Sequence, residues 1–249
     1  MNPLLLAVII AVVYGALLFC FVRFFGVRYT ELTKSTAHIK KGIFYPVGIG
    51  GLILVVVSAL NGWLIPSFTP PAGYSAPWMW IIPGSLALGS ILRFMHSRWH
   101  EFTRAGIIYM VAGVLLVGFS EELLTRGLLV HFISQAEVPQ FVVALISSAL
   151  FGLLHGMNYF NGQDLKTTIA QVLITSVTGL GLYTTFIVSG TLWVPILLHS
   201  VFDLSLLSQG GPINKPTAHP PKAEVLLALT FYIGSLVALI ALVIHAVVN

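Results

Sequence analysis

Long segments without charged residues recur along the whole chain. The first runs from Leu4 to Val22, and no Asp, Glu, Lys or Arg interrupts it. A helix of about 18 or more apolar residues is long enough to cross the roughly 30 Å hydrocarbon core of a bilayer. Only 8% of the 249 residues carry a formal charge, whereas a soluble domain typically has about a quarter. The pattern therefore predicts an all-α, polytopic membrane protein.

The hydropathy pattern predicts a bundle of about eight membrane-spanning helices in a single transmembrane domain that covers residues 1–249. The seventh apolar segment is short and nearly touches the sixth, so a count of seven is the alternative. The N-terminus lacks the basic start and short apolar core of a cleaved signal peptide, which predicts a retained first helix. The predicted spans are residues 3–23, 43–65, 77–95, 106–131, 139–158, 169–189, 191–207 and 223–247.

Positively charged residues fall in alternate loops between these spans. Cytoplasmic loops of membrane proteins carry an excess of Lys and Arg, so these loops are predicted to be cytoplasmic and both termini to lie outside. The same distribution accounts for the net charge of +4, and no nucleic-acid partner is expected. The residues are Arg23, Arg28, Lys34, Lys40 and Lys41 in the first loop, Arg93, Arg98 and Arg104 in the third, and Lys215 and Lys222 in the seventh.

Three of the predicted spans contain ionisable residues away from their ends. Each charge in the middle of a transmembrane helix costs about 2.5–3.5 kcal/mol even on the most lenient scales. Such groups would be hard to tolerate facing lipid, so they are predicted to surround one buried polar cavity, the candidate active site. They are Glu121, Glu122 and Arg126 in the fourth span, His155 in the fifth, and His199 and Asp203 in the seventh.

Helical spacing separates the two glutamates. Glu122 and Arg126 are four residues apart, in the order that favours an ion pair on one helix face. Glu121 lies about 100° round the helix from Glu122 and is poorly placed to join that pair. We interpret Glu122 and Arg126 as a structural pair, which leaves Glu121 for chemistry.

The histidines also have neighbours at helical spacing. Asp203 follows His199 by four residues, so its carboxylate could fix the tautomer of the imidazole or act beside it. Phe151 precedes His155 by four residues and is predicted to form an aromatic wall beside it. At about 1.5 Å per residue, the ionisable groups spread over roughly 10–15 Å along the membrane normal, with His155 the shallowest.

Two stripes of small or polar side chains are interpreted as faces where helices pack together. One lies on the fifth predicted span and the other on the sixth, where packing is favoured over substrate contact. They consist of Ala144, Ser148 and Gly152, and of Gln171, Thr175 and Thr178.

A glutamate and two histidines in such a cavity can hydrolyse an amide by two routes. The glutamate could take a proton from water as a general base. The histidines could bind a metal ion that acidifies the water, or donate hydrogen bonds to a developing oxyanion. Ser120 and Ser200 lie beside the cluster, but no spacing marks either as an activated nucleophile. Amide hydrolysis is therefore the predicted chemistry, with both routes open.

These residues also resemble the motifs of a known family. Glu121-Glu122-x-x-x-Arg126, Phe151-x-x-x-His155 and His199-x-x-x-Asp203 are similar, in order, to the three motifs of the CPBP (Abi) family of CAAX-processing and bacteriocin-processing membrane proteases. The motif-bearing core covers about residues 106–207. The resemblance implies an intramembrane endopeptidase whose substrate is a membrane-associated peptide, either CAAX-type and prenylated or similar to a leader or bacteriocin peptide.

The resemblance also implies roles for single residues. Glu121 would activate water, and His155 and His199 would assist as metal ligands or hydrogen-bond donors. The last motif position is often Asn in the family and is Asp203 here. An ionised carboxylate cannot donate to an oxyanion, which favours a role for Asp203 in orienting His199 or in holding a divalent metal such as zinc together with both histidines.

Two other classes of function stay open. The family includes proteins implicated in immunity and scaffolding, so a catalytically silent membrane scaffold or immunity protein is one alternative. A proton-coupled transporter that uses the buried acids and histidines as a relay is the other, although no inverted repeat with broken helices is apparent. The small size and short loops favour a prokaryotic cell-membrane protein.

Overall fold

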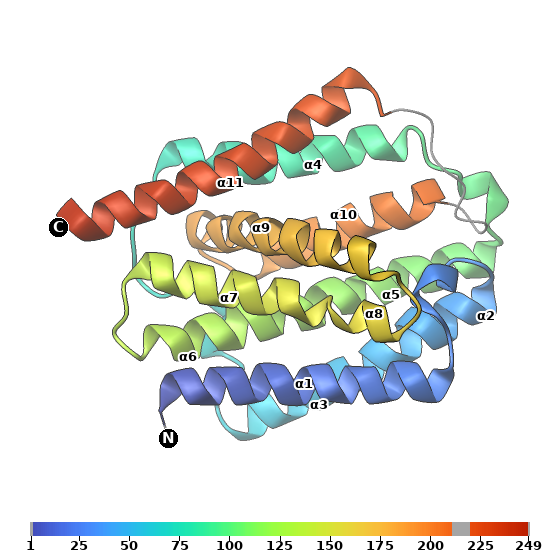
Figure 1. Cartoon of the computed structure of the whole chain (residues 1–249), viewed down its shortest axis with the longest axis horizontal. Helices are drawn as coiled ribbons and strands as arrows, with labels where there is room; N and C mark the ends of the chain where they lie inside the picture. Colours follow the sequence, from blue (N-terminus) through green and yellow to red (C-terminus); the bar gives the residue numbers. More distant parts are fainter. Residues whose placement is uncertain (1, 211–219, 249) are drawn as a thin grey trace.

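The computed structural model describes residues 2–210 and 220–248, and within these residues it contains helices and no strand. Figure 1 shows the long helices running side by side in one bundle, with both marked termini at the same end. Helix α1 and helix α11 lie on opposite sides of the bundle, with α7 and α9 between them. The predicted all-α membrane bundle is confirmed.

Six helical segments of the described chain are long and apolar enough to cross a membrane. They are α1 (Pro3–Phe25); α2 (Thr36–Ile39) with η2 (Lys40–Phe44) and α3 (Tyr45–Leu60); α5 (Arg104–Glu122) with η6 (Leu123–Leu129) and α6 (Val130–Ser134); α7 (Gln140–Leu154) with α8 (Met157–Phe160); α9 (Leu165–Ser189); and α11 (Lys222–Val248). The other two predicted spans contain α4 (Ile81–Phe94) and α10 (Trp193–Gly210), which are helical but not among these six. A count of eight spans therefore stays a prediction.

Local capping explains where two of the long helices begin and end. The side chain of Asn2 accepts hydrogen bonds from the first backbone N–H groups of α1, and Asp164 does the same for α9. Both helices end at a glycine, Gly26 or Gly190, with φ of 68°. Glycine adopts this left-handed conformation without the steric cost that a Cβ atom brings.

A π-helical segment follows directly after the two adjacent glutamates. Segment η6 (Leu123–Leu129) is fully buried and contains Arg126. Its i→i+5 hydrogen bonds widen the helix, and such segments are frequent at functional sites. The wider turn still brings the side chains of Glu122 and Arg126 into contact.

One residue assigned to a loop from the sequence lies elsewhere. Arg93 was counted with the third loop, although the predicted span 77–95 includes it, and it is in the last turn of α4 and is buried. It forms an ion pair with Glu224 of α11 at 2.9 Å and donates to Ser205 of α10 at 3.1 Å. The loop assignment was wrong because a carboxylate from a distant helix allows this guanidinium to be buried.

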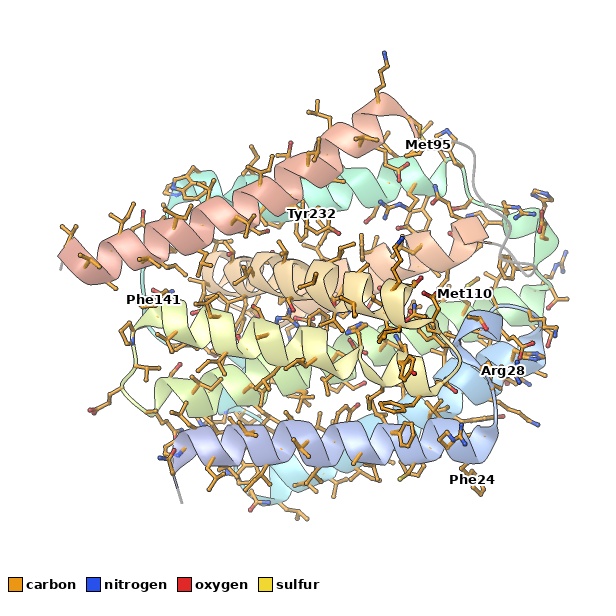
Figure 2. All side chains as sticks on the ribbon, in the orientation of Figure 1. Phe24, Arg28, Met95, Met110, Phe141 and Tyr232 are labelled. Carbon is orange, nitrogen blue, oxygen red and sulfur yellow. The ribbon has the colours of Figure 1, made fainter. Side chains whose placement is uncertain are left out.

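The basic residues used to predict the topology lie mainly at one end of the bundle. Figure 2 places Arg28 and Met95 at the end opposite to Phe141. Lys215 lies outside the described residues. Which end faces the cytoplasm stays a prediction from the distribution of positive charge.

The small-residue stripe on α7 packs against α9, as the sequence predicts. A Cβ atom on Gly152 would lie 2.6 Å from the carbonyl oxygen of Val172, and a Cβ atom on Gly179 would lie 2.9 Å from the Cα of Ser148. Glycine at these two positions lets the two backbones approach closely.

Substitution of Gly152 with Ala is therefore expected to destabilise the fold by about 1–3 kcal/mol, because the added methyl group overpacks a fixed backbone contact. Gly84→Ala provides the matched control, since a Cβ atom there has nothing within 4 Å. Equilibrium unfolding in mixed micelles measures both variants. Equal stability of the two variants would contradict the predicted overpacking between α7 and α9.

Candidate active site

Three helices bring the predicted site residues together. Glu121 and Glu122 end α5, His199 and Asp203 lie on α10, and Phe151 and His155 lie at the end of α7. Helix α10 approaches α5 closely at Gly118, where a Cβ atom would lie 2.8 Å from the carbonyl oxygen of Ile196. This close contact places the glutamates of α5 beside the imidazole of His199.

Glu122 lies at the centre of a buried hydrogen-bond network. Its Oε1 accepts from Nη1 of Arg126 and from Nδ1 of His199, each at 2.8 Å. The Glu122 and Arg126 side chains are fully buried. The predicted pair is thus formed and has a third member that the sequence did not indicate. Because a carboxylate only accepts, Nδ1 of His199 carries a proton and Nε2 is the nitrogen left for other contacts.

Glu121 and Asp203 lie on the other side of the same imidazole. Nε2 of His199 is 3.5 Å from Oδ2 of Asp203 and 3.9 Å from Oε2 of Glu121. Oε2 of Glu121 is buried and accepts no hydrogen bond from any described residue. Glu121 therefore has an oxygen available for a water molecule or a substrate. Oε2 of Glu122 also has no partner among the described residues, but Oε1 of Glu122 is held by Arg126 and His199, and Glu122 does not line the cavity described below.

The ring of Phe151 connects the remaining parts of the site. Its centroid is 4.3 Å from the guanidinium carbon of Arg126. The ring centroids of His155 and His199 lie 5.1 and 5.6 Å from it, both in T-shaped contacts. His155 follows the last residue of α7, and its Nδ1 lies 3.1 Å from the carbonyl oxygen of Phe151. The sequence predicted that His155 lies at a shallower depth in the membrane than His199. This difference does not keep the two imidazoles apart, because the ring of Phe151 contacts both.

A cavity of about 680 Å³ is lined by Glu121, Phe151, His155, His199 and Asp203. Its volume is within the range of about 300–1,000 Å³ that is usual for ligand sites. Most of its wall is apolar and comes from α1, α4, α9, α10 and α11. The ionisable residues among its lining are Tyr14, Tyr29, Arg93, Glu121, His155, His199, Asp203, Glu224 and Tyr232.

Several polar residues of the cavity were not assigned to the site from the sequence. Gln171, Thr175 and Thr178 line it, although their stripe was interpreted as a packing face. Arg93 and Glu224 form their ion pair in its wall. Glu224 could have been found by the rule that identified the other charges, because it lies at the start of a predicted span.

The described part of the chain contains no cluster of side chains that is arranged to bind a metal ion. No group of three His, Cys, Asp or Glu side chains there could hold a metal ion, and this includes the predicted set of His155, His199 and Asp203. Cys20, the single cysteine, lies exposed on α1. Metal dependence therefore stays a prediction.

The order and placement of these motifs agree with a comparison to known families. Residues 103–205 match the family model described as type II CAAX prenyl endopeptidase Rce1-like. This part of the chain is similar to the Rce1-like family. The match includes Glu121, His155, His199 and Asp203, and it confirms the resemblance to CPBP membrane proteases. Comparisons with curated proteins and with solved structures gave no significant match.

Proposed function

We propose that the chain is an intramembrane endopeptidase that hydrolyses a peptide bond of a membrane-associated substrate with water activated by Glu121. One observation carries this proposal. Oε2 of Glu121 is buried, has no partner among the described residues, and faces His199 across 3.9 Å in the wall of the cavity. The family match supports a membrane endopeptidase in general.

In the proposed first step, Glu121 takes a proton from a water molecule while the water oxygen attacks the carbonyl carbon of the scissile bond. The carbonyl oxygen becomes an oxyanion. His155 and His199 line the same cavity and are the candidate donors of hydrogen bonds to it. In the second step the tetrahedral intermediate collapses and the C–N bond breaks. The proton held by Glu121 passes to the leaving amine.

Glu122, Arg126 and Phe151 support this chemistry without contacting the reacting atoms. The hydrogen bond from His199 to Glu122 fixes the tautomer and orientation of the imidazole. Arg126 balances the charge of Glu122 and packs over the ring of Phe151. In this proposal Asp203, at 3.5 Å from Nε2, orients His199 from the opposite side and stabilises its protonated form.

The proposed substrate is a lipidated or strongly apolar peptide. The mostly apolar cavity wall includes residues of α1, α4 and α11, and can take up an acyl or prenyl chain as well as a peptide. Tyr29 of η1 (Tyr29–Glu31), which follows the end of α1 near the basic loops, also lines the cavity. The positive-inside rule then favours a substrate that arrives from the cytoplasmic side. The test is cleavage of such a peptide by the purified chain in liposomes, with Glu121→Gln as the inactive variant.

Cleavage is expected to continue after divalent metals are removed, because no three His, Cys, Asp or Glu side chains among the described residues are placed to bind one metal ion. The measurement compares the cleavage rate before and after dialysis against a chelator, with bound zinc quantified by mass spectrometry. A loss of cleavage that zinc alone restores would contradict the metal-free version and favour His155 and His199 as ligands.

A further inference from the structure

A second polar network lies in the same cavity, outside the three motifs. It joins Tyr29 of η1, Asn158 of α8 and Gln171 of α9. Nε2 of Gln171 donates to the hydroxyl oxygen of Tyr29 at 2.9 Å, and Nδ2 of Asn158 donates to Oε1 of Gln171 at 3.1 Å. All three side chains line the cavity together with Glu121 and His155.

Backbone hydrogen bonds fix this network next to the active site. The N–H of Asn158 donates to the carbonyl of His155 at 3.1 Å, so the network begins one turn after a predicted catalytic residue. The N–H of Tyr29 donates to the carbonyl of Asn161 at 3.0 Å. The segment that follows α1 is thereby fastened to the segment that carries Asn158.

The two ends of the network are left free to bind a ligand. Gln171 uses both its oxygen and its nitrogen within the network. Among the described residues, the hydroxyl hydrogen of Tyr29 has no acceptor and Oδ1 of Asn158 has no donor. One end therefore offers a donor and the other an acceptor. Reversing both side-chain amides exchanges the ends and again leaves one of each.

Tyr29 keeps its proton in this position. Burial raises the pKa of the Tyr29 phenol, and the nearby negative charges of Asp203 and Glu121 raise it further. Tyr29, Glu121 and Asp203 line the same cavity.

We propose that Tyr29, Gln171 and Asn158 bind the main chain of the substrate beside the scissile bond. A peptide group carries one N–H donor and one C=O acceptor, which complement the two free ends of the network. Main-chain hydrogen bonds supply affinity without selecting side chains. This inference rests on the proposed peptidase function and adds the binding of the substrate backbone to it.

Peptide binding to the full-length chain in nanodiscs tests the proposal. The probe is a fluorescent peptide that ends in a farnesylated CAAX sequence, and all variants carry Glu121→Gln so that no cleavage occurs. Tyr29→Phe and Asn158→Ala are each expected to raise the Kd about threefold to tenfold, as for the loss of one hydrogen bond. Tyr159→Phe is the matched control, because Tyr159 is exposed and is not part of the cavity wall.

A second probe separates binding from a structural role. The same peptide is made with one backbone N–H methylated at a time. Methylation of the peptide N–H that the network contacts is expected to weaken binding to the protein with Glu121→Gln alone. The same methylation is expected to have no further effect on binding to the Asn158→Ala variant, which has already lost the acceptor. The inference would be overturned if all variants bound within twofold of Tyr159→Phe. It would also be overturned if methylation and Asn158→Ala had additive effects on the Kd at every methylated position, or if the protein with Glu121→Gln alone bound no peptide. Binding without cleavage when Glu121 is intact would instead overturn the proposed function alone.

Discussion

Replacement of Glu121 with Gln is expected to lower the rate of peptide cleavage by roughly 10²–10⁴-fold, the usual contribution of a general base. The amide keeps the size of the side chain but cannot take a proton from water. The fold should be unaffected, because Oε2 of Glu121 has no hydrogen-bond partner in the described chain. The measurement is the initial rate of release from an internally quenched farnesylated peptide in proteoliposomes.

Glu137→Gln is the matched control for this variant. Glu137 is exposed in the loop between α6 and α7 and is not part of the cavity wall. Its replacement should leave the cleavage rate unchanged. A Glu121→Gln protein that cleaves within tenfold of the wild-type rate would rule out Glu121 as the base.

Breaking the ion pair between Glu122 and Arg126 is expected to produce the largest loss of stability. Arg126→Met leaves the carboxylate of Glu122 fully buried with His199 as its remaining partner. Loss of one member of a buried ion pair typically costs about 3–5 kcal/mol. Arg126 also donates to Thr125 and to the carbonyl of Gly179, so α9 loses a contact as well. Equilibrium unfolding in mixed micelles, together with the yield of folded protein, measures the effect.

The ion pair between Glu31 and Lys34 offers a control with the opposite expectation. Its side chains are 36% and 58% exposed, so Lys34→Met should change stability by less than about 1 kcal/mol. If Arg126→Met folded as well as this control but lost cleavage, Arg126 would belong to the catalytic set and not to the structural pair.

The physics of membranes explains why part of the site could be predicted from the sequence. A charge inside a span is costly, so Glu121, His199 and Asp203 stood out among apolar neighbours. The four-residue spacing of Glu122 and Arg126 predicted a contact that the structure contains at 2.8 Å. Such inferences need only local geometry, and they hold where both partners lie on one helix.

Contacts between distant segments left no comparable signal. His199 is 77 residues from Glu122, so no spacing indicated that Glu122 orients the imidazole. Arg93 was counted with a loop, and nothing local to it indicated its partner Glu224, which is 131 residues away. The stripe that contains Gln171 was interpreted as packing because the hydroxyl of Tyr29 comes from a segment 142 residues earlier. The estimated depth of His155 assumed straight, parallel helices and could not include the end of α7 at Leu154.

Hydrolysis of a defined peptide in ¹⁸O-labelled water tests the central claim most directly. Purified wild-type protein in proteoliposomes should convert the farnesylated peptide into two fragments, with one ¹⁸O atom in the new carboxyl group. The Glu121→Gln variant should give neither fragment above background. Intact peptide after incubation with wild-type protein, or equal amounts of labelled fragments from both proteins, would contradict the account of a peptidase that activates water through Glu121.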